Sequence, residues 1–303
     1  MTIDPRLRSP DRLTLRAPLA LRLRDVSDFS SICADLLVTA TATGSSGRSF
    51  ALTATAGGTW STQKLPGVPP ATAANPALWT AEAQAFEIRV SDPLQRYLPL
   101  RMVARLPAVA AIAWPGFAAL PAGVRAALRP AGSPAGYRPD FLPLFPGVAR
   151  VSAGARAEVR AHLAIAVDGV PAGNAGFAVM TVSIGGSIRG VGVADGDGAI
   201  LASFPYPPLP TPTPAALAAG TTRSEWQVSI SVYYGRLNPL ADGAPPLLPD
   251  ILAQLNRPPS RLLARLGSST KLPEQTLTVG QPLVLLSARA APAKPSSLFI
   301  VPA

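Results

Sequence analysis

The sequence contains very few of the residues that build most catalytic and metal centres. Among 303 residues there is one cysteine, Cys33, and one histidine, His162. A single cysteine cannot form an intrachain disulfide, and it leaves a zinc site without its usual sulfur ligands. His162 lies in an alternating segment typical of a strand, and the sequence has neither a Gly-x-Ser-x-Gly motif nor a Walker loop. We therefore predict that the protein is not an enzyme and that it needs no cofactor.

Acidic residues are also scarce. The chain has 17 Asp and Glu against 27 Lys and Arg, which gives a net charge of +10. The positive charge is dispersed and does not form a block with interleaved aromatics, so we expect no nucleic-acid binding and favour acidic protein surfaces as partners. Arginines are dense only near the N-terminus, where Arg16, Arg22 and Arg24 lie on one alternating segment. We predict these three residues to be interface residues.

Long apolar runs are missing as well. The 35 prolines exclude long uninterrupted helices. The apolar tract 103–120 is broken by Arg105, Pro107 and Pro115, so we expect no membrane span. The first residues lack the apolar core of a signal peptide. We therefore expect the protein to be cytoplasmic at synthesis.

The sequence does contain a repeat. The stretches 36–66 and 177–205 share a β-rich pattern, with Gly44 and Gly58 punctuating the first and Gly185 and Gly198 the second. Each is followed, after a polar or Pro-rich linker, by an alternating segment that begins with an aromatic residue, 86–90 or 226–230. A repeat on this scale predicts two related β units.

The punctuation of the chain predicts a mainly β fold of two tandem sandwiches, transthyretin-like or immunoglobulin-like, with Pro-rich arms. Strands are expected at 14–24, 36–42, 48–55, 85–90, 97–105, 158–167, 177–184, 225–234, 277–279, 283–286 and 299–301. Short helices are expected at 251–256, capped by Asp250, and at 261–266, capped by Ser260. Pro99 favours an edge position for its strand. The expected parts are a first sandwich with an arm (1–110), an ordered Pro/Ala-rich connector (111–150), a second sandwich (151–245) and a short helical and extended C-terminal appendage (246–303).

The irregular segments carry aromatic residues that flexible linkers rarely contain. Trp114, Phe117 and Tyr137 lie in the connector, and Trp79 lies in an earlier Pro-rich segment. These aromatics can pack on their own domain or on a neighbouring subunit. We predict Trp79, Trp114, Phe117 and Tyr137 as interface residues, with the two tryptophans as exposed anchors.

Asp195 and Asp197 flank Gly196 and are the best calcium candidates in the chain. Two carboxylates can contribute to such a site, but calcium takes six to eight oxygen ligands. The same Asp-Gly pairs also supply the backbone conformation of a tight hairpin. We favour the hairpin turn.

The second unit resembles the carboxypeptidase regulatory-like family, whose fold is a transthyretin-like β-sandwich. The resemblance rests on segments 168–172 (Asp-Gly-Val-Pro-Ala), 194–198 (Ala-Asp-Gly-Asp-Gly) and 203–207 (Ser-Phe-Pro-Tyr-Pro); the first unit has Ala-Gly-Gly at 56–58 where the acidic turn belongs. The order downstream, including 248–255 (Leu-Pro-Asp-Ile-Leu-Ala-Gln-Leu), resembles proteins encoded beside phage-tail-like contractile injection systems.

The resemblance implies a non-enzymatic structural or adaptor subunit of a large assembly. Its partners would be sheath, tube, cap or baseplate components, or further copies of itself. The resemblance also implies that the protein enters a particle that can later be released from the cell. The alternative is a carbohydrate- or surface-binding module, for which Trp60, Trp79, Trp114 and Trp226 are the aromatic candidates. Trp226 begins an alternating strand, which favours a place in the core.

Overall fold

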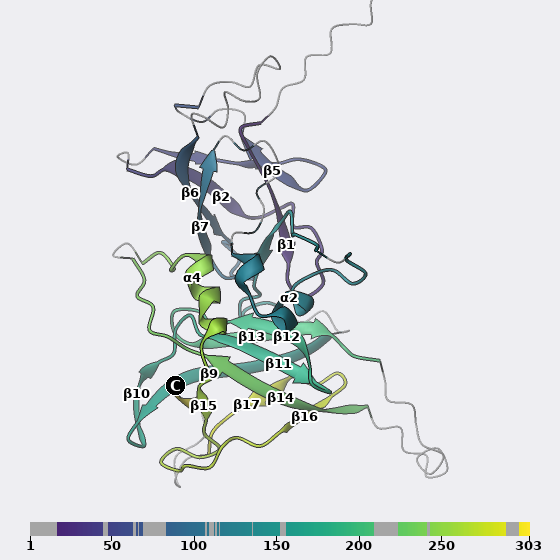
Figure 1. Ribbon diagram of the computed structural model, residues 1–303, viewed down its shortest axis with the longest axis vertical. Helices are drawn as coiled ribbons and strands as arrows, with labels where there is room; N and C mark the ends of the chain where they lie inside the picture. Colours follow the sequence, from purple (N-terminus) through teal and green to yellow (C-terminus); the bar gives the residue numbers. More distant parts are fainter. Residues whose placement is uncertain are drawn as a thin grey trace, which may run out of the picture.

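The computed structural model describes most of the chain, and it is mainly β (Figure 1). The described residues are 17–44, 48–62, 65, 67–68, 83–106, 108, 112, 114, 116–134, 136–151, 156–208, 224–240, 243–288 and 297–303. Arg16 and Trp79, both predicted interface residues, lie outside them.

The first half of the chain forms two four-stranded sheets. One has the order β4-β5-β1-β8, with β4 (Thr53–Ala54), β5 (Thr59–Thr62), β1 (Leu19–Asp25) and β8 (Leu142–Leu144). The other has the order β3-β2-β6-β7, with β3 (Ser49–Ala51), β2 (Leu37–Ala42), β6 (Gln84–Ser91) and β7 (Leu100–Leu106). The strand that follows Pro99 is at the edge of its sheet, as predicted.

Alternation in the sequence explains how these sheets form a core. On β1, Leu19, Leu21 and Leu23 are fully buried, while the residues between them remain partly exposed. On β6 the same period buries Phe86 and Ile88. Both strands contribute to one hydrophobic cluster, so a period of two places one face of each sheet in a common core.

The second half is organised around the long strand β9 (Arg156–Val167). Antiparallel strands β13 (Ala199–Pro205) and β10 (Val170–Asn174) pair with β9, and so do parallel strands β17 (Leu283–Leu285) and β18 (Leu298–Val301). Strand β15 (Arg261–Leu262) extends the sheet beyond β18. A second sheet has the order β12-β11-β14-β16, with β12 (Ser187–Val193), β11 (Val179–Ile184), β14 (Glu225–Tyr233) and β16 (Gln275–Thr278).

The two halves share their strand pairings. β1 pairs with β5 as β9 pairs with β13, and β2 lies between β3 and β6 as β11 lies between β12 and β14. β7 and β16 then occupy the same place beside β6 and β14. In each half a later segment adds a parallel strand, β8 on β1, and β17 and β18 on β9. The repeat seen in the sequence therefore corresponds to a repeated order of strands.

The C-terminal part is not an appendage, contrary to the prediction from sequence. Leu262, Leu277, Leu285 and Ile300 are buried in the main core of the second half, because strands β15 to β18 complete its sheets. The helix predicted at 261–266 is wrong for the same reason. Ser260 donates its backbone N–H to the carbonyl of Val232 on β14, instead of capping a helix, and β15 follows. Long-range pairing outweighs the local helix signal here.

Two other predicted boundaries shift. The helix expected at 251–256 begins earlier, as α4 (Leu248–Ala253), and continues into the 3-10 turn η2 (Gln254–Asn256). Pro249 lies in its first turn, where the missing N–H costs nothing, and Asp250 is in that turn instead of capping it. The strand expected at 48–55 divides into β3 and β4, which belong to different sheets.

The region 111–150 is not a separate connector. It contains the 3-10 turn η1 (Phe117–Ala119), the helix α2 (Ala122–Ala127) and β8, and the buried apolar side chains among its described residues belong to the core of the first half. Figure 1 shows α2 and α4 between the sheets of the first half and those of the second. Each of these helices has six residues, and no described helix is long and apolar enough to cross a membrane.

Candidate interaction sites around the junction of the two halves

The two halves meet through a continuous apolar contact. α2 packs on β12, where Gly123 lies so close to Ile188 that an added Cβ would be 3.3 Å from its Cδ1. On α4, Leu248 and Ile251 join the hydrophobic cluster of the first half, which also takes in Val193 from β12. The junction is therefore part of a packed core, not a linker between free domains.

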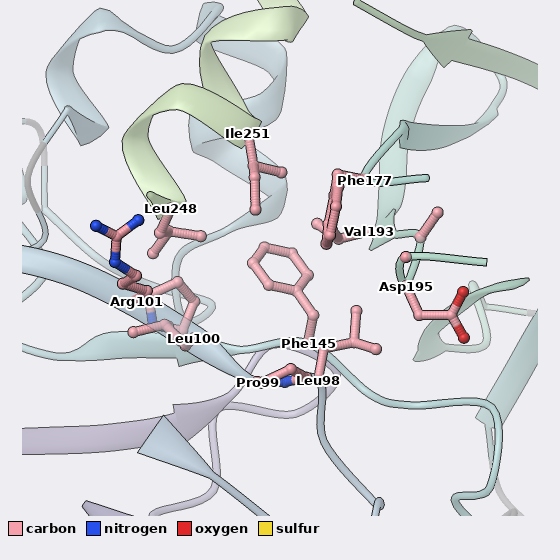
Figure 2. Close-up of a pocket in the computed structure, with 13 residues that line it drawn as sticks. Leu98, Pro99, Leu100, Arg101, Phe145, Phe177, Val193, Asp195, Leu248 and Ile251 are labelled. Atoms are coloured by element: carbon pink, nitrogen blue, oxygen red, sulfur yellow. The ribbon is translucent and has the colours of Figure 1, made fainter. Parts of the chain in front are cut away.

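A small apolar cavity of about 60 Å³ lies within this junction. Figure 2 shows Phe145 from the first half and Phe177 from the second on its wall, with Ile251 of α4 above them. The charged ends of Arg101 and Asp195 point away from the space. Because its lining is mostly apolar, the cavity offers little that could orient a polar ligand.

A buried polar cluster lies at one side of the junction. The carboxylate of Asp25, which is fully buried, accepts hydrogen bonds from the Ser27 backbone N–H at 2.8 Å and from the Tyr97 hydroxyl at 3.1 Å. Arg150 forms an ion pair with the same carboxylate. Burial, together with the negative charge of Asp25, raises the pKa of Tyr97 to about 12. Tyr97 thus stays a neutral hydrogen-bond donor.

Arg156, the first residue of β9, extends this cluster into the second half. Its guanidinium donates a hydrogen bond to Ser27 Oγ at 2.6 Å and pairs with Asp28. Burial alone would raise the pKa of Asp28, but hydrogen bonds from Ser30 and the Arg156 charge outweigh it and lower that pKa. These contacts attach β9 to the loop that follows β1.

The arginines predicted on β1 are engaged within the chain. Arg22 forms an ion pair with Asp140, and both side chains are almost half exposed. The Arg24 guanidinium lies 5.4 Å from the centre of the Phe141 ring and donates a hydrogen bond to the carbonyl of Phe29. Their first role is therefore to attach segment 140–141 to β1.

Two of the predicted aromatic interface residues are buried. Trp114 and Phe117 are 4% and 6% exposed, and their ring centres are 5.1 Å apart. The prediction of Trp114 as an exposed anchor is wrong, because this ring fills the core beneath η1. Tyr137 is half-buried, and burial together with the nearby Asp140 raises its pKa.

Asp195 and Asp197 form a hairpin turn. The Oδ1 atom of Asp195 accepts hydrogen bonds from the backbone N–H groups of Asp197, at 3.0 Å, and Ala199, at 2.8 Å. The part of the chain that the structure describes has no group of three or more His, Cys, Asp or Glu placed to hold a metal ion. His162 faces the hydroxyl of Ser297 at 3.3 Å.

A basic groove beside α2 was missed by the sequence analysis. It has a volume of about 480 Å³ and is lined by Arg125, Arg129, Arg138, Tyr137 and Phe117 together with alanine and glycine residues. Arg125 lies on α2, whereas Arg129 follows the end of this helix at Ala127, so helical periodicity does not bring the two together. Arg138 follows two turns, closed by backbone hydrogen bonds from Ser133 to Pro130 and from Tyr137 to Pro134, which periodicity does not reveal either.

Comparison with models of known protein families found no match, and neither the curated proteins nor the solved structures gave a significant one. The resemblance to the carboxypeptidase regulatory-like family stays a prediction.

Proposed function

We propose that the chain is a non-enzymatic structural or adaptor subunit of a large protein assembly, specifically a phage-tail-like contractile injection particle. The observation that carries this proposal is the packing of two equivalently paired β units into one body. In the proposal each half is a transthyretin-like β-sandwich, consistent with the way the sheets of each half contribute to its core. The choice of particle rests on the sequence resemblance.

The junction between the two halves supports a role as a rigid structural subunit. The contacts of Arg156 with Asp28 and Ser27 and the apolar contacts of α2 and α4 connect the halves. A structural subunit that fixes the relative positions of its neighbours needs a rigid internal geometry, because a hinge between its halves would let those positions vary. The described tie between the halves therefore favours a building block over two independent binding modules.

Exposed strand edges supply surfaces for neighbours. β10 lies at the end of its sheet order, and all five of its residues are exposed. Val170 on this edge is 62% exposed and Val167, across the hairpin, is 53% exposed. The apolar side chains at this edge offer a surface for packing by a neighbour, whereas Pro171 and the bulge between Pro171 and Gly173 disfavour the addition of a further strand.

Sedimentation of the native protein tests the proposal. A tagged full-length chain, expressed in its own host at its natural level, should enter fast-sedimenting particles together with sheath and tube subunits, as identified by mass spectrometry. The same tag on an unrelated cytoplasmic protein provides the control. Recovery of the chain only as a free monomer, in cells that make such particles, would contradict the proposal.

One observation favours the alternative function, carbohydrate binding. A hollow of about 350 Å³ in the second half is lined by Asn174, Asp197, Tyr234, Arg236 and Asn238. Amide, carboxylate and guanidinium groups of this kind bind sugar hydroxyls. A glycan array probed with the full chain and with an Asn238→Ala variant tests it, and binding that this substitution removes would establish a sugar site.

The aromatic contribution to such a site is weak. Trp60 and Trp226, two of the candidate stacking residues, are buried. Trp60 donates its indole N–H to the carbonyl of Ile32, and Trp226 stacks on Tyr206. Both tryptophans therefore serve the core.

A further inference from the structure

The basic groove beside α2 combines concentrated positive charge with an apolar floor. Arg125, Arg129 and Arg138 line it, and none of its lining residues is acidic. Ala122 and Ala126 on α2 contribute methyl groups to the same lining. The groove therefore offers guanidinium groups beside a shallow apolar surface.

The guanidinium groups of the groove have donors to spare. Arg125 donates one hydrogen bond to the carbonyl of Ala118 at 2.9 Å, which leaves most of its five N–H groups for other acceptors. Within the described part of the chain, Arg129 and Arg138 have neither a hydrogen bond nor an ion pair. This distinguishes them from Arg22 and Arg150, which are paired with carboxylates.

We propose that this groove binds an acidic segment of a protein partner through the carboxylates of its Asp or Glu side chains. The planar guanidinium fork matches a carboxylate with two parallel hydrogen bonds, and three forks in one hollow can hold two or three such groups. The alanine methyls accommodate small apolar residues between the acids. The inference deepens the proposed function, because it names a surface through which the subunit would contact a neighbour.

The surroundings favour a protein segment over a nucleic acid. Nucleic-acid binding uses positive charge that continues along a series of phosphates. Here Asp140, which is paired with Arg22 on β1, is close enough for its negative charge to act on Tyr137 of the groove. The positive region is thus bounded on this side by a carboxylate, which suits a short acidic peptide.

Fluorescence anisotropy with a labelled hexaglutamate peptide tests the inference. The full-length protein should bind this probe, should not bind hexaglutamine, and should bind more weakly as salt is raised, because salt screens exposed charges. An Arg129→Glu/Arg138→Glu variant should weaken binding by about tenfold or more, since two attractions become repulsions. Circular dichroism establishes that each variant is folded.

A matched control separates the groove from net charge. Arg261→Glu/Arg265→Glu makes the same change of charge at two exposed residues of the second half, and should leave binding within about twofold. Equal loss in both variants, or no binding by the unmodified protein, would overturn the inference. Tighter, groove-dependent binding of a single-stranded oligonucleotide would overturn the assignment to an acidic protein.

Failure of this experiment differs from failure of the proposed function. Peptide binding is measured on the purified protein, whereas the proposed function is tested by sedimentation of the tagged full-length protein from its own host. If the protein sediments in particles but does not bind the peptide, the structural role is supported and the inference about the groove is overturned. If the protein binds the peptide but does not sediment in particles, the groove is supported as a binding site and the proposed function is contradicted.

Discussion

Replacing Asp25 by Asn should destabilise the protein far more than the same change at Asp140. Asp25 is fully buried, and its ion-pair partner Arg150 is only 18% exposed. Asp140 pairs with Arg22, but these two side chains are 48% and 43% exposed. Both substitutions remove one negative charge and keep the side-chain shape, so their difference isolates the effect of burial.

The magnitude follows from what Asn can still do at position 25. Its amide oxygen can take the place of Oδ1 and keep the hydrogen bond from the Ser27 N–H. The NH2 group then replaces Oδ2, which accepts from Tyr97 and pairs with Arg150, so the Tyr97 hydrogen bond and the charge opposite Arg150 are lost. Breaking a buried pair by removing one partner costs about 3–5 kcal/mol, and the residual exposure of Arg150 reduces this to about 2–4 kcal/mol. For the solvent-exposed pair of Asp140 we expect about 0–1 kcal/mol.

Urea unfolding followed by tryptophan fluorescence and by circular dichroism measures both free energies of unfolding. Adding Arg150→Met to Asp25→Asn should restore part of the stability, because it removes the unpaired charge, whereas Arg150→Met alone should be destabilising. Losses at Asp25 and Asp140 that agree within about 0.5 kcal/mol would refute the reasoning. Breaking the buried Asp25–Arg150 ion pair would then cost no more free energy than breaking the exposed Asp140–Arg22 pair.

Two further outcomes are expected. Gly190→Ala should cost about 1–3 kcal/mol, because its Cβ would lie 2.3 Å from Cδ1 of the buried Phe204, whereas Gly57→Ala, with its nearest atom 3.9 Å away, should change stability by less than about 0.5 kcal/mol. Equal effects in urea unfolding would show that β12 can move away from Phe204. The pKa values of Asp28 and Asp92 are lowered from their usual 3.8, so their stabilisation is present above that pH and is lost as the pH falls through the lower values of the folded state. Unfolding at fixed urea should show stability falling below about pH 3.8, and Asp92→Asn should make that fall shallower; an unchanged slope would contradict this linkage.

Individual strands and hairpins could be predicted because residues close together in the sequence determine them. The alternation at 19–24 predicts a strand with one buried face, and the glycine-bounded hairpins predict the repeat that reappears as shared pairings. Pro99 predicts an edge because proline lacks the N–H that an inner strand must donate. Each of these signals acts within a few residues of its effect.

The rest depends on partners far away in the sequence. β8 and β15 are three- and two-residue segments that become strands by pairing with β1 and β18. Arg22 was predicted to face a neighbour, but its counter-charge Asp140 is 118 residues further along the chain. The amino-acid composition gives the number of arginines and acidic residues, but it does not show which of them form ion pairs.

The groove and the repeat are connected through α2. Val124 and Leu128 of this region are buried in the core of the first half, while Gly123 lies against Ile188 on β12 of the second. The helix that carries Arg125 is therefore held from both sides, although six residues are too few for a stable helix in isolation. The second β unit thus helps to position the arginine groove of the first, which gives the duplication a physical role beyond added surface.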